Sequence, residues 1–72
     1  MEWKQERLDT GQVEHQGFSH TGTHVASIIK DKYRFRVFWK CRNVSSFTRQ
    51  SLKSAKADVE LIFNDEIDRL VA

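Results

Sequence analysis

The segment from Lys32 to Arg42, KYRFRVFWKCR, alternates between apolar and basic side chains almost without interruption. Successive side chains of a strand point to opposite faces of a sheet, so this pattern predicts a β-strand with one aromatic face and one cationic face. The apolar face would carry Tyr33, Phe35, Val37, Trp39 and Cys41. The cationic face would carry Lys32, Arg34, Arg36, Lys40 and Arg42, interrupted by Phe38. A fold built around this strand must cover the aromatic face with another element.

The flanking segments predict two further strands. The run from His24 to Ile29 is apolar and β-branched, and a tight connection at Lys30 and Asp31 would join it to the alternating strand as a β-hairpin. After that strand, Asn43 favours a turn, and residues 44–48 (VSSFT) form a short third strand.

A C-terminal helix should follow. Ser51 is a good N-cap residue, and apolar residues then recur at the spacing of a helix. The stripe comprises Leu52, Ala55, Val59, Ile62, Phe63, Ile67, Leu70 and Val71. The expected fold class is therefore α+β, a three-stranded antiparallel β-meander packed on one C-terminal helix (β-β-β-α), with residues 24–72 as the domain.

Residues 1–23 are expected to form an irregular segment that is mobile or loosely docked. The stretch from Asp9 to Thr23 holds all three glycines of the protein and has little periodicity. Trp3 is the exception, because a large aromatic side chain near a terminus either docks on the domain or lies in a disordered tail.

The length of 72 residues predicts one small domain. Its single cysteine, Cys41, excludes an intramolecular disulfide and is expected to be a small buried side chain. We expect an intracellular, cytoplasmic protein, because the sequence shows neither a membrane span nor the apolar run of a signal peptide.

Positive charge is concentrated in the middle of the chain. Residues 30–56 hold nine Lys or Arg and one Asp, a net charge of +8, although the whole chain carries only +2. Alternate cations along a strand lie ~6.6–6.8 Å apart, similar to successive phosphates, and neutralising phosphates releases counterions. An exposed Phe38 would contact sugars or bases. The candidate nucleic-acid-binding residues are Arg34, Arg36, Phe38, Lys40, Arg42, Arg49 and Lys53. The alternative is a solvated face whose charges prevent aggregation.

The start of the expected helix offers a related interpretation. Arg49, Lys53 and Lys56 lie near its N-terminus, where the helix dipole disfavours cations. A bound anion would account for this arrangement, and so would a separate acidic contact surface in the C-terminal half.

Catalytic and metal sites are not expected. The spacing of His15, His20, His24 and Cys41 matches no familiar zinc pattern. Ser, His and Asp occur without the local context of a nucleophile or an acid/base pair. We expect no enzyme activity, no cofactor and no metal.

The run from Ala26 to Ile67 resembles the three-stranded-sheet-plus-helix modules at the amino terminus of phage tyrosine recombinases and the AP2-type DNA-binding domains. The shared features are a strand of the YRFRV type, a short third strand ending in Ser-Phe-Thr, and a helix that opens on Ser with SAK and a later acidic residue. The resemblance implies that the open sheet face lies in the major groove of DNA and that Arg34, Arg36, Phe38 and Lys40 contact it.

Two functions remain open at this stage. The first is a module that binds double-stranded DNA through the basic face of the sheet. The second is a phage- or prophage-type protein-interaction module, such as a homodimer or a regulator or inhibitor of a host protein, without nucleic-acid binding. Membrane binding is not expected, because the cations lie on a strand and no basic amphipathic helix accompanies them.

Overall fold

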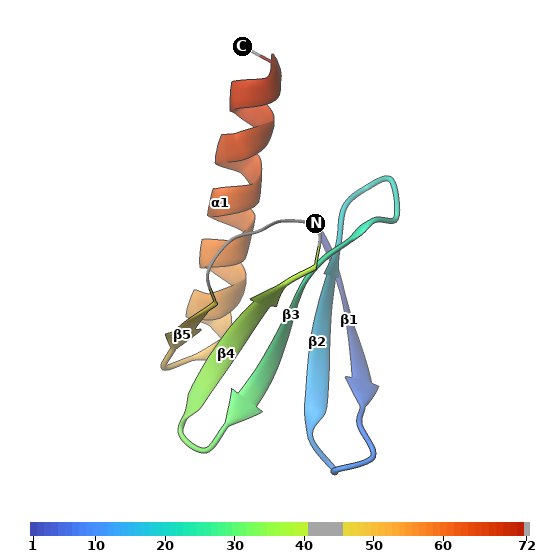
Figure 1. Ribbon diagram of the computed structural model, residues 1–72, viewed down its shortest axis with the longest axis vertical. Coiled ribbons are helices and arrows are strands. Elements are labelled where there is room, and N and C mark those ends of the chain that lie inside the picture. Colours follow the sequence, from blue (N-terminus) through green and yellow to red (C-terminus); the bar gives the residue numbers. More distant parts are fainter. Residues whose placement is uncertain (41–45, 72) are drawn as a thin grey trace.

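The protein is one five-stranded antiparallel sheet followed by one helix (Figure 1). The computed structural model describes residues 1–40 and 46–71, and the side chains of residues 1–40 and 46–64. The strands lie in chain order: β1 (Glu2–Arg7), β2 (Val13–Phe18), β3 (His24–Asp31), β4 (Arg34–Trp39) and β5 (Phe47–Arg49). The helix α1 spans Leu52–Val71.

The prediction of a three-stranded meander is wrong, because the segment expected to be irregular supplies two more strands. β1 pairs with β2 from Glu2↔Phe18 to Arg7↔Val13, and β2 pairs with β3. The β2–β3 register shifts between Gly17 and Phe18, which marks a β-bulge. The three predicted strands are therefore part of a wider sheet.

The predicted hairpin between the strand at His24–Ile29 and the alternating strand is present, as β3 and β4. Its connection is displaced, however. Asp31 pairs with Arg34, so the loop consists of Lys32 and Tyr33 rather than Lys30 and Asp31. Lys32 has a φ of 57°, the left-handed conformation that such two-residue loops require. Tyr33, which was expected in the core, lies at the tip and is 91% exposed.

The third predicted strand is shorter and later than expected, at Phe47–Arg49. The predicted turn at Asn43 and the predicted buried position of Cys41 lie outside the described residues, as does Arg42. The predicted N-cap is confirmed, because Ser51 Oγ accepts a hydrogen bond from the backbone N–H of Ser54 at 3.1 Å.

The core lies between α1 and one face of the sheet. Its fully buried side chains are Val25, Ala26, Ile28, Val37, Ala55 and Val59. Partly buried apolar side chains surround them: Trp3, Phe35, Trp39, Phe47, Leu52 and Phe63. The predicted contact between the helix stripe and the face of Phe35, Val37 and Trp39 is thus confirmed for the N-terminal half of the helix.

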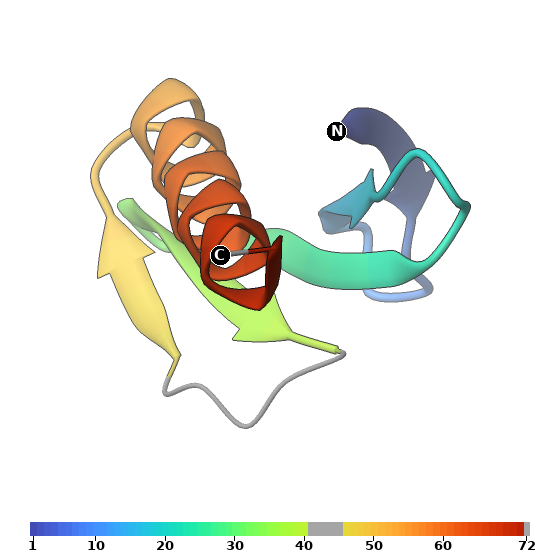
Figure 2. The same cartoon turned by 90° about the horizontal axis from the view of Figure 1, so that it is seen from above.

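The helix covers one face only, and no described helix or strand covers the other (Figure 2). We call these the helix side and the helix-free face. α1 contacts β3, β4 and β5, and its C-terminal turns extend past the ends of the strands (Figure 1). The molecule is accordingly elongated, with extents of 41 × 23 × 20 Å.

Candidate functional site

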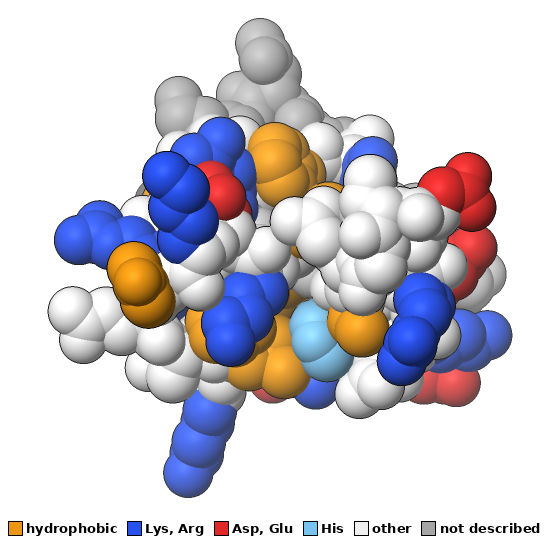
Figure 3. All heavy atoms as spheres, turned by 90° about the horizontal axis from the view of Figure 1, so that it is seen from below, with side chains coloured by type: hydrophobic (Ala, Val, Ile, Leu, Met, Phe, Trp, Pro, Cys, Tyr) orange, Lys and Arg blue, Asp and Glu red, His pale blue; other side chains and the backbone are white. Residues whose placement is uncertain are grey.

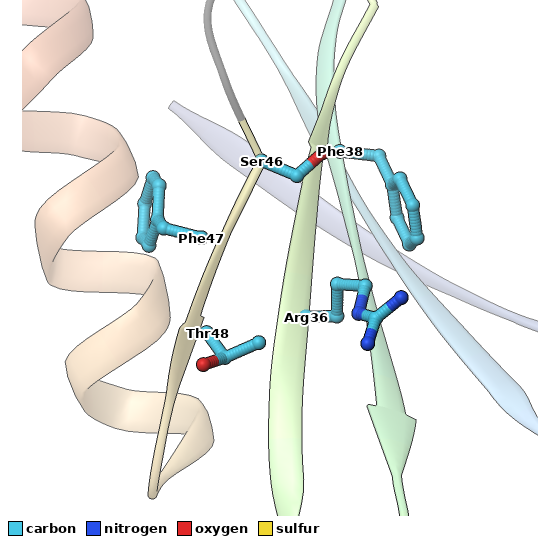
Figure 4. A pocket seen from close by; sticks show the side chains of 5 residues that line it. All are labelled: Arg36, Phe38, Ser46, Phe47 and Thr48. Carbon is cyan, nitrogen blue, oxygen red and sulfur yellow. The ribbon is translucent and has the colours of Figure 1, made fainter.

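Three of the predicted site residues lie together on the helix-free face of β4. Arg34 and Arg36 are exposed and Phe38 is half-buried. Figure 4 shows Arg36 and Phe38 projecting to one side of the sheet, whereas Phe47 points to the helix. A hollow of about 290 Å³ lies here, lined by Arg36, Phe38, Ser46, Phe47 and Thr48. Lys40 follows directly after β4 and is exposed.

Two other predicted site residues lie elsewhere. Arg49 pairs with Phe35 in the sheet and forms an ion pair with Asp58 of α1, so its guanidinium is on the helix side. Lys53 is exposed on α1 itself. The structure therefore does not unite Arg49 and Lys53 with the cations of β4, and the predicted seven-residue site is divided.

The helix-free face is not uniformly cationic, in contrast to the expectation from the sequence pattern. Glu6 and Glu14 are hydrogen-bonded by Gln16 Nε2 at 2.9 and 2.6 Å, respectively, on the β1–β2 half of this face. The hydrogen bond from Gln16 is the largest cause of a lowered pKa at Glu14, assisted by Ser27, Lys40 and His24 and opposed by burial. An ionised carboxylate therefore lies on the helix-free face beside Ile29, two residues before Asp31.

Cations gather instead at the end of the β3–β4 hairpin. We call this the hairpin end and define it as Lys30, Lys32, Tyr33 and Arg34. The acid within this segment, Asp31, is engaged by Arg36 at 3.2 Å. Within residues 1–40 and 46–64, no ion pair involves Lys30, Lys32 or Arg34. The hairpin end therefore combines three unbalanced cations with an exposed aromatic ring.

Figure 3 views the molecule from this end. Most Lys and Arg side chains lie in the left half of the view, whereas on the right, the side of β1, Asp and Glu side chains lie among further Lys and Arg side chains. A hollow of about 250 Å³ lies on the helix-free side of the tip, lined by Asp31, Lys32, Tyr33, Arg34, Arg36 and Thr48. The sequence prediction missed Lys30, Lys32 and Tyr33 as site residues. It assigned Lys30 to the turn and Tyr33 to the core, and it placed Lys32 on the cationic face without including it in the site.

A second hollow, of about 360 Å³, lies on the helix side of the same hairpin. It is lined by Gly11, Gln12, Val13, His15, Lys30, Lys32 and Phe35. His15 is 9% exposed, and its Nδ1 has no hydrogen-bond partner among the described residues. Burial lowers the pKa of His15, and the nearby charge of Lys56 lowers it further. The imidazole is therefore neutral at pH 7, with one donor and one acceptor nitrogen.

The three histidines are dispersed. His15 lies on the helix side, and His20 is exposed in the β2–β3 connection. His24 is stacked on Phe18 at 4.9 Å, and its Nε2 is hydrogen-bonded to Ser27 Oγ at 2.9 Å. Among the described residues, no group of three or more His, Cys, Asp or Glu side chains could hold a metal ion.

Comparison of the chain with models of protein families, with curated proteins and with solved structures finds no match. In the part of the chain that the structure describes, no helix combines the length and apolarity needed to cross a membrane.

Proposed function

We propose that this protein is a nucleic-acid-binding module that contacts phosphates through its hairpin end. The observation that carries the proposal is the concentration of Lys30, Lys32 and Arg34, without ion-pair partners among the described residues, around the exposed ring of Tyr33. Such cations neutralise phosphates and release condensed counterions, which supplies most non-specific affinity for nucleic acids. We also propose that the protein is cytoplasmic.

The dimensions favour the hairpin over the flat sheet as the contacting element. Five strands at ~4.8 Å spacing span about 19 Å between the outer two, wider than the major groove at ~12 Å. A two-stranded ribbon fits that groove. Arg34 and Arg36 keep the contact role proposed from the sequence, now as part of the hairpin and its base.

The exposed tyrosine adds a second mode of contact. Tyr33 is 91% exposed and is flanked by Lys32 and Arg34. Solvent exposure of so large a ring is unfavourable in isolation, whereas stacking on a base contributes about 1–3 kcal/mol. Tyr33 is the residue in the hairpin end that would contact bases or sugars rather than phosphates.

The test is fluorescence anisotropy with a labelled DNA duplex at several salt concentrations. We expect binding that weakens steeply with salt. The triple variant Lys30→Gln/Lys32→Gln/Arg34→Gln should reduce the slope of log K against log salt by about 2.7, at about 0.9 per lost phosphate contact. The control is the double variant Arg49→Gln/Lys53→Gln, whose changes lie on the other side of the sheet.

The proposal is wrong if the unmodified protein does not bind at low salt, or if the triple variant binds as the unmodified protein does. Equal losses per removed charge in the triple variant and in the Arg49/Lys53 control would show that total charge, rather than the hairpin end, determines binding.

Self-association is a second candidate, supported by the divided charge of the helix-free face. Arg34 and Arg36 occupy its β4 half, and Glu6 and Glu14 occupy its β1–β2 half. A second copy related by a two-fold axis could place opposite charges over one another, and an isologous contact requires such self-complementarity. Analytical ultracentrifugation tests this candidate. A monomer at every concentration would contradict it. The variants Arg36→Glu and Glu14→Arg should each dissociate the dimer, and the double variant that combines them should restore it.

A further inference from the structure

The hollow of about 360 Å³ on the helix side of the hairpin exists because α1 does not cover the whole sheet. The helix contacts β3, β4 and β5, so the end of β2 at Val13 lies outside these contacts. The connection through Gly11 and Gln12 closes the hollow on one side, and Gln12 Nε2 donates to the carbonyl oxygen of Lys30 at 3.2 Å. This volume lies at the lower end of the range of about 300–1,000 Å³ that holds small ligands.

The floor of the hollow is apolar and partly aromatic. Val13 and Phe35 line it, and both side chains are half-buried. Phe35 thus offers part of its ring to the hollow while its remaining surface packs against the core. A flat apolar group is the natural complement of such a surface, because aromatic side chains hold unstacked bases by stacking.

His15 supplies a polar group at the inner wall. Its Nδ1 is buried without a hydrogen-bond partner among the described residues, and such a group costs free energy unless something satisfies it. The ring is neutral because burial and Lys56 lower its pKa. Neutral imidazole can donate one hydrogen bond and accept another, which suits the mixed donor and acceptor edge of a nucleobase.

The rim of the hollow belongs to the hairpin end. Lys30 and Lys32 line the hollow, and both are exposed. The same two ammonium groups that contact phosphates in the proposed function therefore stand at the mouth of an apolar cavity. Cationic rim, aromatic floor and an unsatisfied imidazole occur together at this one place in the described structure.

We propose that this hollow receives one unpaired nucleotide of the bound nucleic acid, with its base against Phe35 and Val13 and its phosphate between Lys30 and Lys32. His15 forms a hydrogen bond to the edge of the base after a rotation of its ring, because Nδ1 is buried in the unbound structure. This inference rests on the proposed function of the hairpin end and adds a preference to it. The protein should favour a duplex with a bulged or overhanging nucleotide over a fully paired one, because a paired base cannot leave the stack without an unpairing cost.

The experiment compares three labelled DNA probes of the same stem: fully paired, with a single-nucleotide bulge, and with an abasic residue at that bulge. We expect about tenfold tighter binding of the bulged probe than of the other two, the size of one base-stacking contact. Phe35→Leu, which keeps an apolar side chain, and His15→Gln, which keeps a polar one, should each reduce that preference. Phe38→Leu is the matched control, because Phe38 is also half-buried in β4 but lies on the helix-free face.

A second measurement does not depend on the folding of the variants. In the unmodified protein, titration with adenosine monophosphate should shift the NMR resonances of Val13, His15 and Phe35 and leave those of Phe38 and Thr48 unchanged.

The outcomes separate the two proposals. Equal affinity for the three probes, or a preference that persists in both Phe35→Leu and His15→Gln, overturns the nucleotide site and leaves the hairpin proposal intact. Shifts confined to the helix-free face in the titration also overturn it. Absence of binding to all three probes at low salt overturns both proposals.

Discussion

Trp3 donates its indole N–H to Glu60 Oε1 across 2.9 Å, and this bond joins the first strand to the helix 57 residues later. Lys56 strengthens the same contact, because its Nζ lies 5.4 Å from the centre of the Trp3 ring. Both partners of Trp3 come from α1, one turn apart on the side that faces β1. The N-terminal segment is therefore attached to the core by a specific set of side-chain contacts as well as by the sheet.

The variant Trp3→Phe should reveal the strength of this attachment. It keeps an aromatic ring but removes the hydrogen bond to Glu60. We expect the free energy of unfolding to fall by about 1.5–3 kcal/mol, the usual net contribution of a hydrogen bond to a charged group. Urea denaturation measures it. Leu61→Ala is the control, since Leu61 is 68% exposed on the same helix. A double-mutant cycle with Glu60→Ala should show that the two losses are not additive.

The packing of the Trp3 side chain also requires a glycine at position 17. A Cβ atom there would lie 2.9 Å from Met1 Sδ and 2.9 Å from Trp3 Cζ3, closer than such atoms normally approach. We expect Gly17→Ala to lower the free energy of unfolding by about 1–3 kcal/mol, because overpacking displaces the indole. The same substitution in a Trp3→Ala background should cost clearly less. Equal costs in the two backgrounds would show that the indole does not limit the space at Gly17.

The missed strands show what sequence patterns can and cannot detect. β1 has the sequence EWKQER, with Trp3 as its single apolar residue, because it is an edge strand that lies mostly outside the helix contact. β2 presents Val13, His15 and Gly17 to the helix side, and neither His nor Gly gives an apolar signal. Strands without apolar alternation cannot be found by periodicity, whereas β4 and α1, which bury continuous stripes, were predicted correctly in type.

The candidate site was only partly predictable for a related reason. The alternation around Phe35 and Val37 placed Arg34 and Arg36 on the helix-free face correctly. The same alternation runs on through Tyr33, although the chain has already turned there. Nothing in the pair Lys32 and Tyr33 marks a turn, because neither is Gly, Asn or Asp. Glu6 and Glu14 lie on the helix-free face because they belong to β1 and β2, two strands that the sequence pattern did not reveal.

The pKa of His15 predicts a pH dependence of stability. Burial and Lys56 lower this pKa below its ordinary value of about 6.5. The unfolded chain therefore binds a proton more readily than the native protein, and the free energy of unfolding should fall as the pH drops below about 6.5. Denaturation at about pH 7.5 and about pH 5.5 measures the loss.

His15→Gln should abolish that loss over the same pH interval. The variant His20→Gln, at an exposed position in the β2–β3 connection, should retain it. The lowered pKa of Glu14 contributes separately, because its stabilising effect declines only in the acid range below about pH 4.5. A stability that is unchanged between the two pH values would contradict the assigned state of His15.

Replacing Lys32 should change the stability of the protein and its affinity for nucleic acid in opposite directions. Its φ of 57° is a left-handed conformation that is unfavourable for a residue with a Cβ atom and free of that cost for glycine. We expect Lys32→Gly to raise the free energy of unfolding by up to about 1 kcal/mol, since relief of this strain exceeds the added entropy of the unfolded chain. Tyr33→Gly is the control and should lower it, because the φ of Tyr33 is not positive.

The same Lys32→Gly protein should bind nucleic acid more weakly, with a slope of log K against log salt reduced by about 0.9. A variant that is both more stable and weaker in binding would show that the hairpin retains a lysine at a strained position for contact rather than for folding.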